Sequence, residues 1–165
     1  MCGIVGGYAN INSAIKALLH RGPDAQATIQ RGDIYFGHTR LAIIDINERS
    51  NQPFIYRDVC LVFNGELWNY QQLKTELIEL GHVFQTNGDT EILAASISQW
   101  GIEALKRLDG MFAIAWTIDG KTLYLARDRF GEIPLHIACQ KPFFFGSELK
   151  ALQALNANPK SFSDI

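Results

Sequence analysis

Basic runs, long apolar runs and paired cysteines are all missing from this sequence. No stretch of lysines or arginines occurs, and the formal net charge is −2 with a pI near 6.1. Proteins that bind nucleic acid or anionic membranes favour a basic stripe. No apolar run approaches the roughly 20 residues that a membrane-spanning helix needs. We therefore predict neither a nucleic-acid partner nor a membrane partner.

The cysteine content is also low. The three cysteines are odd in number and show no CxxC or Cys/His spacing, so neither a disulfide framework nor a metal site is predicted. The N-terminus lacks the basic segment followed by an apolar segment that marks a secretory signal. These absences favour a reducing, cytoplasmic setting. Cys60 and Cys139 lie in apolar stretches and are predicted to belong to the core.

Size and composition favour one packed domain. The 165 residues are 47% hydrophobic and 19% charged, which suits a single globular core. Apolar periodicity predicts strands at 2–8, 26–30, 33–38, 59–63, 111–118, 122–127, 134–139 and 142–145, and helices at 12–20, 70–80, 89–100, 102–108 and, capped by Ser147, up to Leu155. This order indicates an α+β fold with two mainly antiparallel sheets face to face and helices outside.

Cys2 carries the most specific chemical signal. Removal of Met1, which the small neighbour Gly3 favours, makes Cys2 the chain terminus. An α-amine and a thiol on one residue both titrate near neutral pH, so they form a self-contained base and nucleophile. The alternative is a buried cysteine that acts only as a small hydrophobe, and position 2 by itself does not exclude it.

Eight ordered sequence blocks favour the catalytic interpretation of Cys2. They are MCGIVG at the start, HRGPD from His20, GHTRLAIID from Gly37, FNGELWNY from Phe63, GDTE from Gly88, LDGMFAIAW from Leu108, RDRFG from Arg127 and SELKAL from Ser147. Together they closely resemble the glutamine amidotransferase domain of asparagine synthetases, a family of N-terminal-nucleophile hydrolases. The resemblance covers nearly the whole chain. It implies a four-layer α/β/β/α sandwich, with residues 1–165 forming one glutamine amidotransferase domain.

The resemblance implies a catalytic role for three residues. Cys2 would attack the side-chain amide carbon of glutamine, and the side-chain amide of Asn64 and the backbone N–H of Gly65 would form the oxyanion hole. Donors aimed at a developing oxyanion contribute roughly 3 kcal/mol each, and a glycine permits close backbone approach. Taken alone, the Asn64-Gly65 pair that ends the strand predicted at 59–63 could equally be a turn.

The resemblance also implies a glutamine-binding set. Arg40 would hold the α-carboxylate, Glu66 and Asp89 would hold the α-ammonium group, and the segment from Leu41 to Ile44 would line the pocket. A forked guanidinium suits a carboxylate, and carboxylates suit an ammonium group. Taken alone, Asp89 could be a helix N-cap and Arg40 could belong to a surface ion pair.

Other polar residues are predicted to be structural. Arg21 and Asp24 would fix a loop and support the N-terminus, and Arg127 and Asp128 would form an ion pair beneath the site. The four histidines are also predicted to be structural, because the α-amine already supplies the base. They are His20, His38, His82 and His136.

Two departures from the family pattern concern a partner domain. After RDRFG the family continues with a hydrophobic residue, a lysine and Pro-Leu-Tyr-Tyr, whereas residues 132–137 here are EIPLHI. In the resemblance this stretch faces the synthetase domain, so the change concerns the ammonia acceptor or domain coupling more than glutaminase chemistry. The sequence also lacks the SGGxDS-type phosphate loop of that domain. ATP and magnesium are therefore expected only in a synthetase domain that this chain lacks, and no cofactor is expected here.

The predicted function is hydrolysis of L-glutamine to glutamate and ammonia through a Cys2 glutamyl thioester, with the ammonia passed to the synthetase domain. Two alternatives stay open: the amidotransferase part of an enzyme that aminates a sugar or nucleotide, and a non-catalytic docking or regulatory domain of the same fold. Retention of the full set of predicted catalytic and glutamine-binding residues argues against the second alternative. The oligomeric state is left open, a homodimer included.

Overall fold

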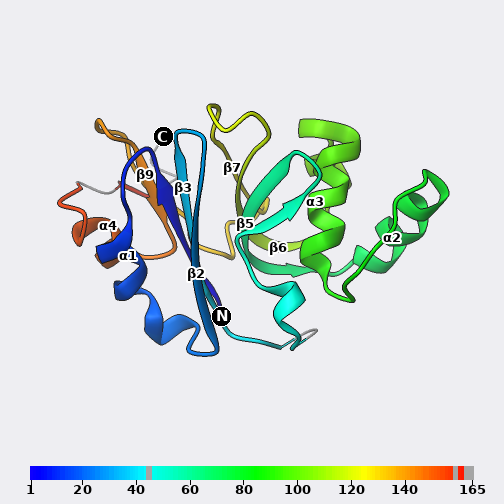
Figure 1. Ribbon diagram of the computed structural model, residues 1–165, viewed down its shortest axis with the longest axis horizontal. Coiled ribbons are helices and arrows are strands. Elements are labelled where there is room, and N and C mark those ends of the chain that lie inside the picture. The colour runs from blue at the N-terminus through cyan, green and yellow to red at the C-terminus, as the bar shows by residue number, and fades with distance from the viewer. Residues whose placement is uncertain (44–45, 158–159, 162–165) are drawn as a thin grey trace.

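Two antiparallel sheets lie face to face in the computed structural model, which describes residues 1–43, 46–157 and 160–161 (Figure 1). The first sheet has the strand order β10 (Lys160–Ser161), β8 (His136–Ala138), β9 (Phe144–Gly146), β1 (Gly3–Gly7), β3 (Ile34–Arg40) and β2 (Ala25–Arg31). The second sheet has the order β4 (Phe54–Tyr56), β5 (Val59–Leu67), β6 (Gly110–Thr117) and β7 (Tyr124–Arg127).

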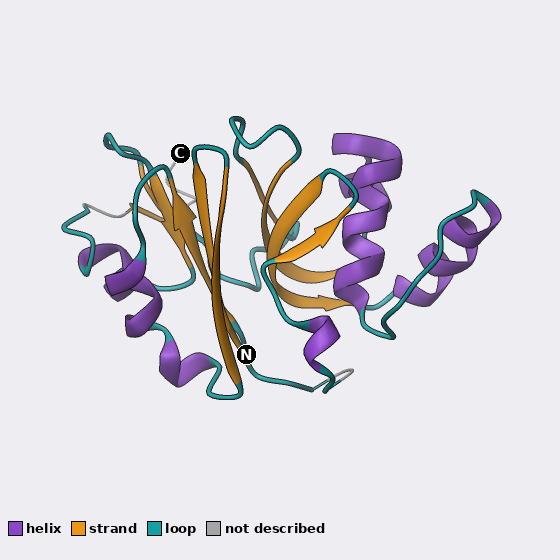
Figure 2. Ribbon diagram, viewed as in Figure 1, coloured by secondary structure: helices purple, strands orange, loops and turns teal. Residues whose placement is uncertain are grey.

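Helices cover the outer face of each sheet (Figure 2). The helices α1 (Asn12–Ala17) and α4 (Leu149–Gln153) pack on the first sheet, whereas α3 (Asp89–Trp100) packs on the second sheet and α2 (Tyr70–Glu79) packs against α3. This layer order confirms the predicted four-layer α/β/β/α sandwich. Within the described ranges, no helix has both the length and the apolar character needed to cross a membrane.

The strands β3 and β5 extend beyond the apolar core, and alternate side chains on each strand face the same way. Phe36 on β3 and Val62 on β5 are fully buried in the core between the two sheets. Alternate residues of a strand share one face. His38 and Arg40 therefore continue the face of Phe36 beyond the core, and Asn64 continues the face of Val62. The two sheets thus present polar side chains toward each other where the apolar core ends.

The strand predicted at 59–63 extends further than expected. The β5 strand runs to Leu67, and Asn64 and Gly65 pair with β6 rather than forming a turn. The predicted strand end is wrong because β6 continues alongside and supplies backbone partners. Gly65 adopts a φ of 150°, and a side chain there would collide with the backbone of Met111. The Asn-Gly pair therefore marks a close backbone approach inside a strand.

Ser147 does not cap the last helix as predicted. It is buried, its hydroxyl accepts the backbone N–H of Ile4 at 2.9 Å, and its own N–H donates to the Ile4 carbonyl at 2.9 Å. The N-cap residue of α4 is Glu148. The hydroxyl is unavailable to the helix because it binds β1, a contact between residues far apart in the sequence.

Two further predictions were wrong, one about the extent of a helix and one about the burial of a cysteine. The helix predicted at 12–20 is split into α1 and a 3₁₀ turn, η1 (Leu19–Arg21). Cys139 is exposed rather than part of the core, since it directly follows β8, whereas Cys60 is buried as predicted.

The stretch at 132–137 is only partly directed outward. Ile133, Leu135 and Ile137 lie in the core between the sheets, with exposed fractions of 1%, 1% and 4%, whereas Glu132 is exposed. Alternate side chains of an extended segment point in opposite directions. The expectation that the stretch as a whole faces a partner is therefore wrong for its apolar half, which replaces a lysine and a tyrosine with core residues.

Candidate active site

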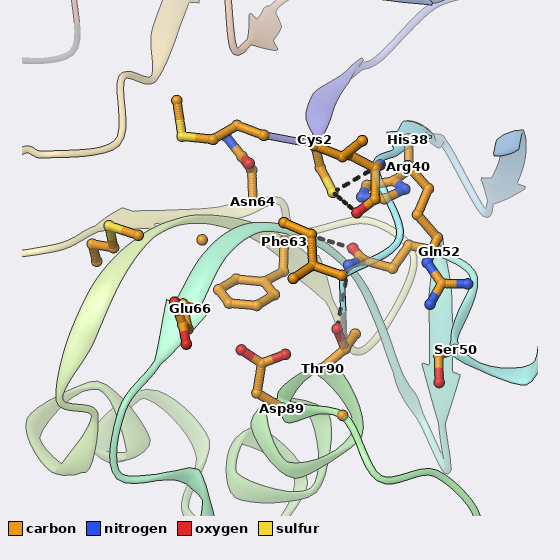
Figure 3. A pocket seen from close by; sticks show the side chains of 16 residues that line it. Cys2, His38, Arg40, Ser50, Gln52, Phe63, Asn64, Glu66, Asp89 and Thr90 are labelled. Atoms are coloured by element: carbon orange, nitrogen blue, oxygen red, sulfur yellow. Dashed lines mark hydrogen bonds between the residues drawn. The ribbon is translucent and has the colours of Figure 1, made fainter. Parts of the chain in front are cut away.

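A cavity of about 240 Å³ forms where the two sheets meet the N-terminus of α3 (Figure 3). It brings together the described residues to which the sequence assigned a catalytic or glutamine-binding role, except Ala42 of the predicted lining segment. These residues are Cys2, Arg40, Leu41, Ile43, Asn64, Gly65, Glu66 and Asp89. Ile44, the remaining predicted lining residue, lies outside the described residues.

Cys2 lines this cavity and lies directly before β1. Cys2 is half-buried, and its sulfur lies 3.5 Å from the backbone N of Leu41 and 3.7 Å from the carbonyl oxygen of Leu41. These are long contacts. The carbonyl of Cys2 is held more firmly, because Arg21 Nε donates to it at 2.8 Å. Arg21 therefore supports the N-terminus, and the thiol itself stays only loosely engaged.

Asn64 and Gly65 lie on the opposite wall, on β5. The Asn64 side chain is 1% exposed, and its amide nitrogen has no hydrogen-bond partner among the described residues. A buried donor without a partner costs about 1–3 kcal/mol. A donor kept unpaired beside a thiol is suited to stabilise an oxyanion that exists only during a reaction.

Two carboxylates face the same space at the far end of the cavity (Figure 3). Asp89, the first residue of α3, is 8% exposed, and its Oδ2 accepts the backbone N–H of Leu67 at 3.0 Å. Burial raises the pKa of Asp89 to about 6, and the nearby charge of Glu66 acts in the same direction, against backbone hydrogen bonds that lower it. A cation bound between these carboxylates would relieve both effects.

Arg40 provides the positive group of the cavity. Its side chain is 7% exposed, and Nη1 donates to the Asn47 carbonyl at 2.9 Å and to Asn51 Oδ1 at 2.7 Å. The alternative of a surface ion pair is therefore excluded by burial. The loop around η2 (Glu48–Ser50) holds the guanidinium in place.

Gln52 was missed by sequence reasoning. Its Oε1 accepts the backbone N–H of Phe63 at 2.6 Å, and its Nε2 donates to Thr90 Oγ1 at 3.3 Å. It therefore ties β5, immediately before Asn64, to the start of α3. No local pattern marks a glutamine for such a role, because both partners are distant in sequence.

His38 is a second residue whose position was not predicted. It was expected to be structural, yet it lines the cavity, is 1% exposed, and has no described partner for Nε2. Burial lowers the pKa of His38 to about 3, and the charge of Arg40 lowers it further, whereas a hydrogen bond with the Phe63 backbone opposes the shift. The imidazole is therefore neutral. Its two-residue spacing from Arg40 on one strand was the available signal.

The remaining predicted supports take several forms. Asp24 Oδ2 accepts the backbone N–H of Ala42 at 2.8 Å and so fixes the loop beside the thiol. Asp128 accepts four backbone N–H groups that hold the turn after β7, from Phe112, Phe130, Glu132 and Ile133. His82 bridges Tyr56 and Gln99 at 2.8 Å on each side, as expected of a structural histidine.

Known proteins share this sequence and this fold. The model of the glutamine amidotransferase domain family matches residues 1–164. Asparagine synthetase [glutamine-hydrolyzing] 1 of Bacillus subtilis is 38% identical over 168 residues, which cover 92% of this chain and 26% of that protein. A putative asparagine synthetase [glutamine-hydrolyzing] of Mycobacterium tuberculosis is 43% identical over 141 residues, which cover 78% of this chain and 22% of that protein.

Solved structures agree with these sequence relatives. Glutamine phosphoribosylpyrophosphate amidotransferase from B. subtilis, complexed with ADP and GMP, superposes with a TM-score of 0.83 at 25% identity over 96% of this chain and 44% of that one. An allosteric regulatory enzyme of purine biosynthesis superposes with a TM-score of 0.86 at 23% identity and so shares the fold. The chain spans about a quarter of the length of these sequence relatives. It belongs to the glutamine amidotransferase domain family.

Proposed function

We propose that this chain hydrolyses L-glutamine to glutamate and ammonia through a thioester on Cys2, in a form from which Met1 has been removed. One observation carries the proposal. A single cavity holds a thiol beside an unpaired amide donor at one end, and a guanidinium and two carboxylates elsewhere in its wall. These groups complement the carboxamide, carboxylate and ammonium groups of glutamine.

Substrate binding follows from charge. The Arg40 guanidinium binds the α-carboxylate, and Asp89 and Glu66 bind the α-ammonium group, because charge-assisted hydrogen bonds are the strongest available to these groups. Leu41 lines the side of the pocket. Anchoring both charged groups directs the γ-carboxamide toward Cys2 and so brings the reacting atoms together.

The first chemical step forms the thioester. The free α-amine of Cys2 accepts the thiol proton, and the sulfur attacks the γ-carbon of glutamine to give a tetrahedral intermediate. Its oxyanion accepts hydrogen bonds from the Asn64 side-chain amide and the Gly65 backbone N–H. The C–N bond then breaks, the proton on the amine passes to the departing nitrogen, and ammonia leaves.

The second step restores the enzyme. A water molecule gives a proton to the α-amine and attacks the thioester carbonyl, again through an oxyanion held by Asn64 and Gly65. The C–S bond breaks, the thiol regains its proton from the amine, and glutamate leaves. The net reaction consumes one water and changes no oxidation state. A thiol that must stay reduced favours a reducing, cytoplasmic setting.

Replacement of the nucleophile tests this function. Protein whose N-terminus is verified as Cys2 by intact mass is assayed for glutamate and ammonia. Cys2→Ala is expected to keep the fold and lose at least about 1000-fold in rate, because the chemistry depends on the sulfur. A Cys2→Ala rate within tenfold of wild type would falsify the assignment.

We further propose that the released ammonia serves a synthetase domain, as the names of the sequence relatives indicate for those proteins. Amide formation from a free carboxylate needs an activating nucleotide, which usually binds a glycine-rich loop at a helix N-terminus. The 165-residue chain is therefore expected to release ammonia without binding ATP. Calorimetry with ATP and an asparagine assay with aspartate and magnesium test this, and asparagine production by this chain alone would contradict it.

A further inference from the structure

The orientation of Cys2 depends mainly on its carbonyl group. Its thiol contacts Leu41 only at 3.5 and 3.7 Å, whereas Arg21 Nε donates to the Cys2 carbonyl at 2.8 Å. In a chain that begins at Cys2, no preceding residue restrains the α-amine. When the carbonyl is fixed, the main remaining freedom is rotation about the Cα–C bond of Cys2. This rotation moves the amine and the thiol together.

Arg21 is in turn held by Glu148. Arg21 Nη1 donates to Glu148 Oε1 at 2.9 Å, across 127 positions of sequence. The two side chains are 11% and 24% exposed, so this ion pair is more sheltered than a surface pair. His20 and Lys150 also contact the Glu148 carboxylate, at 3.0 and 3.1 Å.

The Glu148 carboxylate is ionised throughout the neutral range. Partial burial opposes ionisation, but hydrogen bonds from Arg21, Lys150 and His20 outweigh it and lower the pKa of Glu148 to about 2. The partner of Arg21 is therefore a permanent anion at any pH at which the enzyme would work.

The backbone around Glu148 is fixed to the same strand that Cys2 begins. The neighbouring Ser147 exchanges two hydrogen bonds with Ile4, both at 2.9 Å. Gly3, between Cys2 and Ile4, allows close packing here, since an added Cβ would lie 2.6 Å from Thr39 Oγ1 and 3.3 Å from Arg21 Cδ. One short segment thus holds β1 directly and Cys2 through Arg21.

We propose that Glu148 is a positioning residue for the nucleophile and acts through Arg21. The inference rests on the proposed function and extends it: Glu148 touches no substrate, yet it sets the direction in which the Cys2 amine and thiol point. Loss of the carboxylate leaves Arg21 free to move, and a displacement of the nucleophile of about 1 Å can cost about 100-fold in rate.

Steady-state kinetics of Glu148→Gln and Glu148→Ala test the proposal. We expect kcat to fall about 10-fold and about 100-fold respectively, with KM for glutamine within threefold of wild type and little change in melting temperature. Glu148→Gln keeps the side-chain shape and is available if Glu148→Ala fails to fold. The matched control is Lys150→Met, which removes another partner of the same carboxylate and leaves Arg21 in place. Its kcat should stay within twofold of wild type.

A second readout does not need turnover. Alkylation of Cys2 by iodoacetamide, located by mass spectrometry, should be about fivefold faster in Glu148→Ala because a half-buried thiol gains freedom, while the exposed Cys139 reacts equally in both proteins. Unchanged kcat in Glu148→Ala, an effect on KM alone, or an equal loss in Lys150→Met overturns the proposal. If wild type shows no glutaminase activity, the proposed function fails, and the Cys2 alkylation ratio alone decides the role of Glu148.

Discussion

The two ends of the cavity are built in opposite ways. At the reacting end, the Cys2 thiol makes only long contacts and the Asn64 amide nitrogen has no partner among the residues that the structure describes. At the recognition end, Arg40 makes hydrogen bonds of 2.7 and 2.9 Å with its loop, and Asp89 accepts the Leu67 N–H at 3.0 Å. The groups that would act on the transition state are left unsatisfied, and the groups that would hold the substrate are firmly placed.

This difference has an energetic reason. An unpaired buried donor destabilises the resting protein, and that energy is recovered only when an oxyanion forms. A charged binding group gains from fixed geometry, because its side chain then loses less conformational entropy when the substrate binds. Changes at the reacting end should therefore affect kcat, and changes at the recognition end should affect KM.

Blocking the α-amine should have the largest effect at the reacting end. A chain that retains Met1 or an N-terminal tag has an amide at Cys2 in place of an amine, and an amide is not a base. We expect at least a 100-fold loss of kcat, restored by cleavage that exposes Cys2. Intact mass verifies each form before assay. Normal turnover by the uncleaved form would show that the base lies elsewhere.

Asn64→Ala should have the next largest effect. We expect kcat to fall by about 100-fold, or roughly 3 kcal/mol, with little change in KM, because the donor acts mainly in the transition state. The melting temperature should not fall, since the amide nitrogen has no partner in the part of the protein described. Asn69→Ala, which removes a side chain bonded to the Arg107 carbonyl, is the control for a general asparagine effect. An Asn64→Ala variant with raised KM and normal kcat would contradict the division between the two ends.

Arg40→Ala should act in the opposite sense. Loss of a charge-assisted contact to the substrate carboxylate should raise KM for glutamine about 30-fold with kcat within a few-fold of wild type. Arg40→Lys keeps the charge but loses the fork, so an intermediate KM is expected. If both variants lower kcat and leave KM unchanged, Arg40 does not bind the ground-state substrate.

Asp89→Asn should have the smallest effect on glutamine turnover, and the direction of its effect on stability is the more informative result. The pKa of Asp89 is raised to about 6, so its stabilising contribution is present at low pH and is lost as pH rises through about 6. Above that pH the Asp89 side chain is charged in the folded protein, where burial makes the charged form less favourable than in the unfolded chain. Asp89→Asn should therefore raise the free energy of unfolding at pH 7.5 by about 1–2 kcal/mol while raising KM about 10-fold. Denaturant unfolding of wild type and Asp89→Asn at pH 5 and pH 7.5 measures this difference in free energy of unfolding. A variant less stable than wild type at pH 7.5 would contradict the prediction.

Much of the fold was predictable from local pattern. The strands β1 and β6 follow apolar runs because both of their faces are buried, and helix α2 follows helical apolar spacing because burial of one face imposes that period on the sequence. Errors appeared where a local signal competed with a distant partner. The Asn64-Gly65 pair has the composition of a turn, but β6 keeps it in a strand.

From the sequence, the eight blocks identified the family, and through that resemblance the layer order and the catalytic and glutamine-binding residues of the cavity, because the chemistry requires particular residue types at those positions. The tertiary structure alone decided how those residues are held. Gln52 reaches Phe63 and Thr90, and Glu148 reaches Arg21 across 127 positions. Periodicity tells which face a side chain occupies, but its partner depends on how the two sheets and their helices pack.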